Sequence, residues 1–245
     1  MEEKFISNNV REHREILKHT KKWYKKWWGI LLLSITFLVL IFLTASAFYI
    51  ANQSKLYQER GYLGENNRDT KIYSRAEIEG SNSYFFGTKN PKITIVEFSD
   101  FACPNSKSFY NKTKKIRTKY YNDLKIIHRD FPVIAEHSSD LAQAARCAGE
   151  QGLFWKAHDT LYENQGVSTK PEIFSLILNI GVNEAEFKEC LESNRYLGPI
   201  QKDLKDGINL GIKGTPTWFI NGYRADGDMP EKMLNDYIEN ILLNQ

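Results

Sequence analysis

Cysteine is scarce in this chain of 245 residues, which contains only Cys103, Cys147 and Cys190. Three cysteines allow one disulfide and leave one thiol over. The cysteines and histidines lack the spacing of a metal-binding motif, so we expect no metal and no cofactor. Internal repeats and low-complexity segments are also missing. The hydrophobic share of 42% is large enough for a real core, which excludes a disordered chain.

Charged residues are absent from residues 27–54. Within this stretch, residues 27–50 form an apolar run longer than the roughly 20 residues that cross a bilayer as a helix. We therefore predict one transmembrane helix, a signal anchor, over residues 27–51. The competing interpretation is a signal peptide cleaved after Ala47, because residues 45–47 have the small-residue pattern of a cleavage site. The apolar run continues past that point, which favours the uncleaved anchor.

The net charge of +3 is distributed unevenly. Residues 1–26 contain eight Lys or Arg and four Asp or Glu, whereas the rest of the chain contains 25 and 26. The positive-inside rule places this basic tail in the cytoplasm and everything after the span outside it, in a periplasm or at a cell surface. The lysines of residues 107–119 have no aromatic or glycine-rich readout element beside them. We interpret them as a solvated helix face and expect no nucleic-acid partner.

The remaining chain divides into a linker and a folded domain. Residues 52–82 are polar without a sustained hydrophobic period, and we interpret them as an extracytoplasmic linker. Residues 83–245 have the pattern of an α/β domain, in which residues 136–211 show helical periodicity and predict an inserted helical subdomain. Strands are expected at four apolar runs, and the dipeptide Asn221-Gly222 predicts a hairpin. The runs are residues 84–87, 93–98, 124–129 and 217–220.

The segment 93–120 combines a strand, a turn, a cysteine and a helix. A β-branched run leads to Cys103, and Pro104 follows where a proline suits the first helical turn. Cys103 would then lie beside the unpaired N–H groups at the positive end of the helix dipole, which favour a thiolate over a thiol. A lone cysteine is more often a small buried hydrophobe. This placement instead indicates an exposed nucleophile.

Two motifs carry a resemblance to a known family. EFSDFACPNS, residues 97–106, resembles the active-site segment of the DsbA-like branch of the thioredoxin superfamily, which normally reads Cys-Pro-x-Cys. KGTPTWFING, residues 213–222, is similar to the cis-proline loop of that family. Two separated motifs in the right order make the resemblance specific. It implies a thioredoxin fold with an inserted helical subdomain, preceded here by the transmembrane helix.

The resemblance also implies roles for single residues. Cys103 matches the attacking cysteine, and Ser106 stands where the family has the resolving cysteine. Pro104 and Asn105 match the spacer that tunes the thiol, and we expect both to contact the substrate. Two further residues, Thr215 and Pro216, match the loop that faces the thiol and pairs with a substrate strand, with Pro216 in cis.

Glu97 and the other two cysteines leave alternatives open. A buried carboxylate is costly without a task or a partner, and in resembling proteins the acid at the position of Glu97 relays protons to the resolving cysteine. That recipient is missing here, so a structural and a catalytic role both remain open. Cys147 and Cys190 lie on apolar helix faces. A structural disulfide and two buried thiols that never meet are both compatible with the sequence.

These observations lead to a functional hypothesis with two alternatives. The first choice is a membrane-anchored, extracytoplasmic thiol-disulfide oxidoreductase that acts through one cysteine on secreted or envelope proteins containing cysteines. With Ser106 in place of a second sulfur, release needs an outside thiol or a redox partner protein, which favours an isomerase or reductase over an autonomous oxidase. The alternative is a redox-inactive, peptide-binding or chaperone-like module. A glutaredoxin-like site for glutathione or an iron-sulfur cluster is opposed by export and by the Pro-Asn spacer.

Overall fold

The structure, a computed structural model, describes residues 27–62, 71–81 and 83–244, of which residues 52–62 are described by their backbone alone. The chain divides into two compact units, residues 1–57 and residues 58–245. The basic tail of residues 1–26 and the part of the expected linker at residues 63–70 lie outside the described residues. The expectations about their placement therefore stay predictions.

The apolar run forms a helix, α2 (Trp27–Tyr62). Its segment Trp27–Ala51 has 25 residues and is apolar and long enough to cross a bilayer. Three of its hydroxyl groups are satisfied by the helix itself, because those of Ser34, Thr36 and Thr44 donate to carbonyls three or four residues earlier. Most of its large apolar side chains are exposed. This helix is compatible with a membrane anchor.

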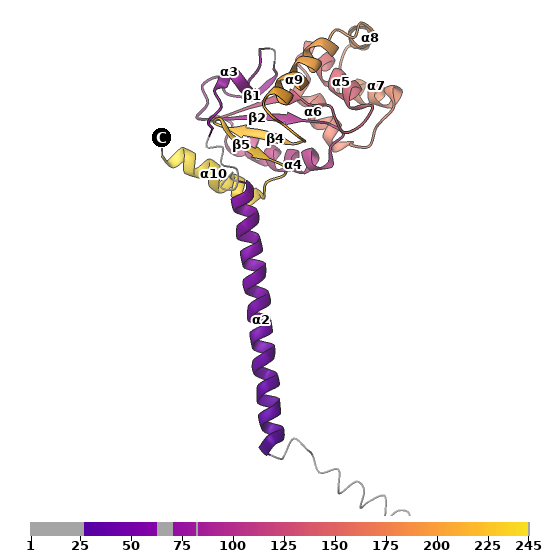
Figure 1. Ribbon diagram of the computed structural model, residues 1–245. Coiled ribbons are helices and arrows are strands. Elements are labelled where there is room, and N and C mark those ends of the chain that lie inside the picture. The colour runs from indigo at the N-terminus through magenta and orange to yellow at the C-terminus, as the bar shows by residue number, and fades with distance from the viewer. Residues whose placement is uncertain (1–26, 63–70, 82, 245) are drawn as a thin grey trace, which may run out of the picture. The chain divides into compact units, whose positions relative to one another are not determined.

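The second unit contains a five-stranded mixed sheet in the order β1-β3-β2-β4-β5 (Figure 1). β2 and β3 are parallel and are joined through helix α4 (Pro104–Lys119), whereas the other neighbouring pairs are antiparallel. β2 and β3 are buried along almost their whole length, as expected from their apolar runs. The strands are β1 (Phe85–Gly87), β2 (Ile93–Ser99), β3 (Leu124–Asp130), β4 (Thr217–Ile220) and β5 (Tyr223–Asp226).

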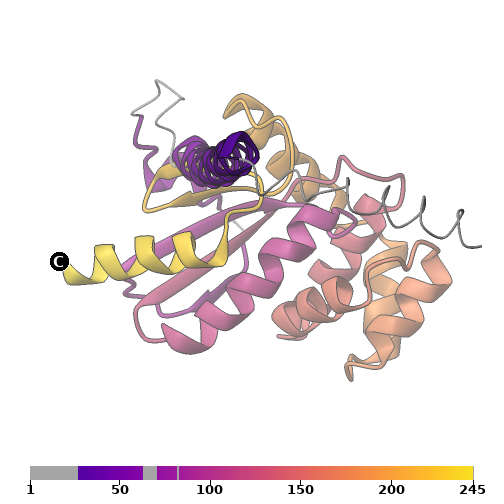
Figure 2. The same cartoon turned by 90° about the horizontal axis from the view of Figure 1, so that it is seen from below.

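Helices cover both faces of the sheet. α4 and α10 (Glu231–Leu243) lie across one face, where their apolar residues pack with those of the strands (Figure 2). The other face is covered by α3 (Arg75–Ile78) and α9 (Leu197–Asn209) (Figure 1). A sheet hydrophobic on both faces needs such a cover on each side.

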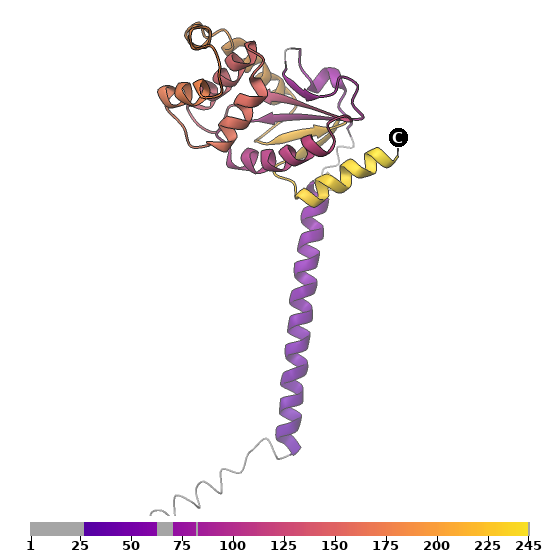
Figure 3. The same ribbon diagram turned by 180° about the vertical axis from the view of Figure 1, so that it is seen from behind.

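The segment between β3 and β4 forms the helical insertion that the sequence predicts. The insertion builds its own core, and its helices other than α9 gather beyond one end of the strands (Figure 3). Its helices run from Ser138 to Asn209, close to the predicted bounds 136–211. Besides α9, they are α5 (Ser138–Glu150), α6 (Phe154–Glu163), α7 (Lys170–Leu178) and α8 (Glu184–Glu192). The predicted α/β architecture with a helical insertion is confirmed.

Buried ion pairs fix the insertion against the sheet. Arg129 of β3 donates from Nε to Asp203 of α9 at 2.7 Å and from a terminal nitrogen to Asp206 at 2.6 Å. Arg146 of α5 donates to Asp203 at 2.6 Å and also pairs with Asp130 of β3. Removing one member would leave a buried charge without its partner, which typically costs about 3–5 kcal/mol. This network therefore sets the position of α5 and α9 on β3.

The folded domain begins before residue 83, so the expected linker over residues 52–82 is too long. Tyr73 and Ile78 are buried against the sheet, with the Tyr73 ring 5.0 Å from that of Phe219. The Tyr73 N–H also donates to the carbonyl of Gly222 at 3.0 Å. Gly222 has φ +87°, and a Cβ there would lie 2.4 Å from the Tyr73 carbonyl oxygen. Only a glycine fits this turn.

Candidate active site

Cys103 lies where the sequence predicts it, between the end of β2 and the start of α4. Cys103 is the N-cap residue, with φ −80° and ψ 121°, and Pro104 takes the first helical position. Its N–H donates to the Asp100 carbonyl at 3.0 Å, and its carbonyl accepts from Lys107 at 3.1 Å. The side chain therefore projects from the helix end at which N–H groups are free.

The loop before β4 faces this cysteine. The Thr215–Pro216 peptide bond is cis, and the Cys103 thiol donates to the Thr215 carbonyl with a sulfur to oxygen distance of 3.2 Å. Residues 112 positions apart thus meet at the end of the sheet. The expectation of an exposed thiol is corrected, because Cys103 is only 3% exposed. The group that contacts its sulfur is a polar backbone carbonyl, which the pattern of the sequence cannot reveal.

Ser106 lies one turn after Cys103 and points into the fold, whereas Pro104 and Asn105 are exposed. Ser106 is 0% exposed. Its hydroxyl has no hydrogen-bond partner in the described part of the chain, so it does not bond the sulfur of Cys103. A buried hydroxyl without a partner is unfavourable. The space at position 106 holds a side chain of this size, but the Ser106 hydroxyl makes no hydrogen bond there.

Glu97 lies in the buried centre of the sheet, opposite His128 on β3 and Trp218 on β4. Burial raises the pKa of Glu97, although the nearby charges of His128 and Arg117 oppose this. Its Oε1 has no hydrogen-bond partner among the described residues. The sequence correctly indicates a buried acid, and its desolvation favours the neutral form over the charged form.

Helix α6 contributes two buried polar side chains, those of Tyr162 and His158. The Tyr162 hydroxyl lies 2.7 Å from the Ser99 hydroxyl, and its pKa is raised well above the ordinary value by burial and then by Glu97. Burial lowers the pKa of His158 to about 4, although Asp159, 2.9 Å from its Nδ1, acts in the opposite direction. His158 is therefore neutral at pH 7. In the described ranges no group of three or more His, Cys, Asp and Glu could hold a metal ion.

Glu97 provides a test of this electrostatic picture. Because its folded pKa is raised above the ordinary 4.5, the stability it confers is fully present below pH 4.5 and is lost as pH rises through the folded pKa. Glu97→Gln cannot ionise. We expect its melting temperature to equal that of the wild type near pH 4 and to exceed it by at least about 2 °C at pH 8. A variant less stable than the wild type at pH 8 would mean that the carboxylate is ionised and paired.

Two residues that the sequence analysis missed hold the active-site turn. One oxygen of the Asp100 carboxylate accepts from the N–H groups of Val133 and Ile134, both at 2.8 Å. Its other oxygen accepts from Ala102 at 2.8 Å. The only sequence signal for Asp100 is an acid directly after a buried strand. Because its carboxylate binds both segments, it fixes the loop after β3 to the turn before Cys103.

Gln165, which follows α6, holds the same turn from the helical insertion. Its amide nitrogen donates to the carbonyls of Phe101 and Cys103, at 2.8 and 2.9 Å. No motif marks this glutamine, because its partners are backbone atoms more than 60 positions away. The insertion thus contributes directly to the placement of the cysteine.

The other two cysteines form a disulfide. Cys147 of α5 and Cys190 of α8 are joined with a Cα–Cα distance of 5.7 Å. Both are 1% exposed and lie in the core of the insertion. The sequence left this pairing open. Cys103 is the one cysteine outside the bridge.

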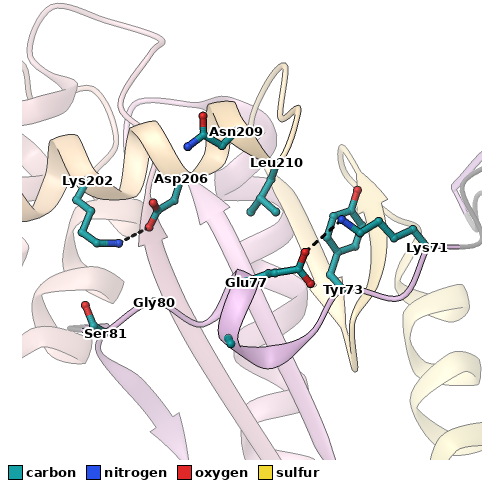
Figure 4. A pocket seen from close by; sticks show the side chains of 10 residues that line it. Lys71, Tyr73, Glu77, Gly80, Ser81, Lys202, Asp206, Asn209 and Leu210 are labelled. Carbon is teal, nitrogen blue, oxygen red and sulfur yellow. Dashed lines mark hydrogen bonds and ion pairs between the residues drawn. The ribbon is translucent and has the colours of Figure 1, made fainter.

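A cavity of about 580 Å³ lies on the sheet face covered by α3 and α9 (Figure 4). Its charged side chains are already paired, Lys71 with Glu77 at 3.2 Å and Lys202 with Asp206 at 2.7 Å. Neither Cys103 nor the loop that faces it lines this cavity. This cavity is therefore separate from the site of Cys103, despite its size.

Comparisons with known proteins agree with this geometry. The model of a family described as thioredoxin matches residues 80–240, more than half of the chain. The chain belongs to the thioredoxin family, and the fold predicted from the two motifs is confirmed. Its fold is that of DsbA-like thiol-disulfide oxidoreductases.

Several solved structures share this fold. The thiol-disulfide exchange protein α-DsbA2 from Wolbachia pipientis has a TM-score of 0.63 at 20% identity, covering 68% of this chain and 91% of that protein. BdbD from Bacillus subtilis has a TM-score of 0.60 at 21% identity, covering 70% and 96%. The catalytic domain of Proteus mirabilis ScsC has a TM-score of 0.61 at 23% identity, covering 69% and 95%.

Curated relatives come from a different class of protein. The Na(+)/H(+) antiporter NhaA 1 of Salinispora arenicola is 29% identical over 153 residues, which are 61% of this chain and 23% of the antiporter. NhaA of Herminiimonas arsenicoxydans is 23% identical over 176 residues, 72% of this chain and 28% of that protein. The chain spans about a quarter of the length of these relatives, so the similarity concerns one segment of them.

Proposed function

We propose that this protein is a membrane-anchored, extracytoplasmic thiol-disulfide exchange protein that acts through the single thiol of Cys103. One observation carries the proposal: the thiol lies at the first turn of α4, 3.2 Å from the carbonyl of Thr215 and next to the cis Pro216. The nucleophile in such exchange is the deprotonated sulfur of a cysteine. The other two cysteines are bridged, which leaves Cys103 to react.

The reaction begins with attack on a disulfide of a client protein. The Cys103 thiolate forms a bond to one client sulfur, the client S–S bond breaks, and the departing sulfur keeps the electron pair and takes a proton from water. Cys103 is oxidised in this step, and the departing sulfur is reduced. Because Ser106 has no sulfur, the mixed disulfide is released by a second client thiolate or by an outside thiol. The first route isomerises disulfides, and the second reduces them.

Single residues around the thiol have proposed tasks in this reaction. The exposed Pro104 and Asn105 contact the client, and the backbone of Thr215 and Pro216 pairs with it as an added strand. Glu97 stores a proton beneath the site, which is supported by the burial that favours its neutral form.

The proposed location follows from the apolar helix and the disulfide. The segment Trp27–Ala51 is long enough to anchor the protein in a membrane, and the basic tail before it favours a cytoplasmic N-terminus. A disulfide such as Cys147–Cys190 persists outside the cytoplasm. The clients are therefore secreted or envelope proteins that contain cysteines, and a redox partner protein would return Cys103 to the thiol.

The second candidate function is a redox-inactive, peptide-binding module on the same fold. It is favoured by the 3% exposure of Cys103, since attack requires the sulfur to become accessible. In this case the loop that contains Thr215 binds an extended chain without a covalent step.

A disulfide isomerisation assay distinguishes the two functions. The full chain in detergent is mixed with a model protein that contains mispaired disulfides, without added oxidant. We expect recovery of the native model protein and, after acid quenching, a mass adduct on the peptide containing Cys103. Binding of the model protein without any adduct would reject exchange and support the peptide-binding module.

A further inference from the structure

A loop joins the end of α9 to the start of β4 and contains Gly214, Thr215 and the cis Pro216. It places the Thr215 carbonyl 3.2 Å from the sulfur of Cys103. The loop is loosely packed directly before this carbonyl. A Cβ at Gly214 would meet no atom of the described residues within 4 Å, apart from its chain neighbours. Contacts outside this part of the loop must therefore fix the position of the carbonyl.

Arg224 of β5 holds the beginning of this loop. β5 is an edge strand of the sheet (Figure 1), and the Arg224 side chain extends from it to the end of α9. Its Nη1 donates to the Leu210 carbonyl at 2.9 Å, and its Nη2 donates to the Gly211 carbonyl at 3.1 Å. Carbonyl groups at the end of a helix lack partners within it and form its negative pole, so a guanidinium suits them. Arg224 thus fixes the point at which the chain leaves α9.

Asp226, two residues later in β5, connects Arg224 to the end of the loop. Side chains two positions apart in a strand point to the same side. Oδ1 of Asp226 accepts from Nε and Nη2 of Arg224, at 3.0 and 2.9 Å. The same oxygen lies 2.9 Å from the Thr217 hydroxyl, which also lies 2.9 Å from the Gly214 carbonyl. Because a hydroxyl has one proton, it donates to one of these two oxygens at a time.

The backbone after β5 adds a further attachment. The N–H of Gly227 donates to the Pro216 carbonyl at 2.7 Å, directly after Thr215. Thr215 therefore lies between two points that are both tied to the same short strand. A segment held at both ends samples fewer conformations than one held at a single end. The contact between the Thr215 carbonyl and the sulfur of Cys103 thus depends on β5.

We propose that Arg224 and Asp226 are positioning residues, which hold the loop so that the Thr215 carbonyl covers the sulfur of Cys103. The proposal rests on the proposed exchange function and adds two residues of the edge strand to it. Their hold has two effects. It shields the sulfur from small reagents, since Cys103 is only 3% exposed. It also keeps the backbone of the loop ordered for strand pairing, so less conformational entropy is lost when a client binds.

Two reagents separate these effects. A peptide whose one cysteine is bonded to thionitrobenzoate needs the ordered loop, whereas the symmetric disulfide of thionitrobenzoate needs only access to the sulfur. In both reactions the Cys103 thiolate bonds to one reagent sulfur, the reagent S–S bond breaks, and coloured thionitrobenzoate leaves with the electron pair. We expect Arg224→Met to lower the rate constant for the peptide at least about tenfold and to raise that for the small reagent at least about threefold.

Three further variants are measured with the full chain in detergent, at a temperature at which all variants are folded. Arg224→Lys keeps the charge without the fork of donors, so it should recover part of the peptide rate. Thr217→Val removes only the hydroxyl of a buried side chain. It should change both rates in the same directions as Arg224→Met, by smaller factors. Arg195→Met is the matched control, because Arg195 pairs with Glu150 and Glu189 of the insertion, at 3.4 and 3.3 Å. Both of its rates should stay within about twofold of the wild type.

The two rates also separate this inference from the function on which it rests. If Arg224→Met leaves both rates unchanged, or changes both in the same direction as a general loss of stability would, the positioning role is overturned and the exchange function is kept. A wild type that reacts with the small reagent but not with the peptide would reject the exchange function. In that case a faster reaction of Arg224→Met with the small reagent would still support the hold of β5 on the loop, and an equal rate would overturn it.

Discussion

Replacing Cys103 with Ala is expected to abolish disulfide exchange, lowering the rate at least about 10³-fold to the uncatalysed background. The physical reason is that Cys147 and Cys190 are bridged in the core of the insertion, so no other thiol remains to attack. Isomerisation of the mispaired model protein and the mass of the trapped adduct measure the loss. The cis-proline loop stays in place, so non-covalent peptide binding should remain within a few-fold of the wild type.

Removal of the Cys147–Cys190 disulfide is the matched control for Cys103→Ala, because it also replaces cysteines with alanine. Cys147→Ala combined with Cys190→Ala should keep Cys103-dependent exchange at a temperature at which the variant is folded. Its free energy of unfolding should fall by about 4 kcal/mol, because the bridge closes a loop of 43 positions. Exchange that persists in Cys103→Ala but disappears in the double variant would reverse the assignment of the reactive cysteine.

Ser106→Cys is expected to create autonomous oxidase activity, which a mechanism with the single thiol of Cys103 does not provide. Positions three apart at a helix start have Cβ atoms about 5–6 Å apart, so a sulfur at position 106 can bond that of Cys103 after a modest adjustment. Ser106 is fully buried without a hydrogen bond to lose, which favours a thiol of similar size. Glutathione disulfide should first oxidise the variant to its internal disulfide, with release of two glutathione thiols. After removal of glutathione, this form should oxidise a reduced dithiol peptide to the peptide disulfide and become the dithiol itself. Loss of the peptide's free thiols and the masses of the peptide and the protein measure this.

Ser108→Cys is the matched control for that gain. Ser108 lies in the same helix, but its hydroxyl donates to Asp228 at 2.6 Å on another side of α4. A sulfur there is five positions from Cys103, so we expect no internal disulfide and no oxidase activity. If Ser106→Cys forms the internal disulfide but stays inert towards the peptide, a second sulfur at position 106 is not sufficient for autonomous oxidation.

The local framework of the site was predictable because its signals are short in range. A β-branched run, a cysteine and Pro104 were enough to predict that Cys103 lies at the start of α4. The dipeptide Asn221-Gly222 predicted the hairpin between β4 and β5, which the two positive φ angles confirm. In each case, the residue type restricts its own backbone, and no distant contact is needed.

The contacts that complete the site were not predictable, because they depend on distant parts of the chain. The thiol of Cys103 donates to the carbonyl of Thr215, and a backbone oxygen has no residue type to mark it. Gln165 binds two carbonyls, and Asp100 binds two N–H groups of another loop, so neither carries a motif. Tyr73 likewise lies in a polar segment, and its burial depends on a glycine that follows it by 149 positions along the chain.

The double hydrogen bond of Gln165 has a consequence for domain recombination. A helical insertion transplanted from a relative would bring its own residue to this position. Unless that residue is a glutamine, the turn that contains Cys103 would lose both hydrogen bonds. Chimeras that keep Gln165 should retain the shape of this turn. Chimeras without it should still fold, but the turn should no longer hold Cys103 in its place. The insertion and the segment that contains Cys103 should therefore be exchanged together in such chimeras.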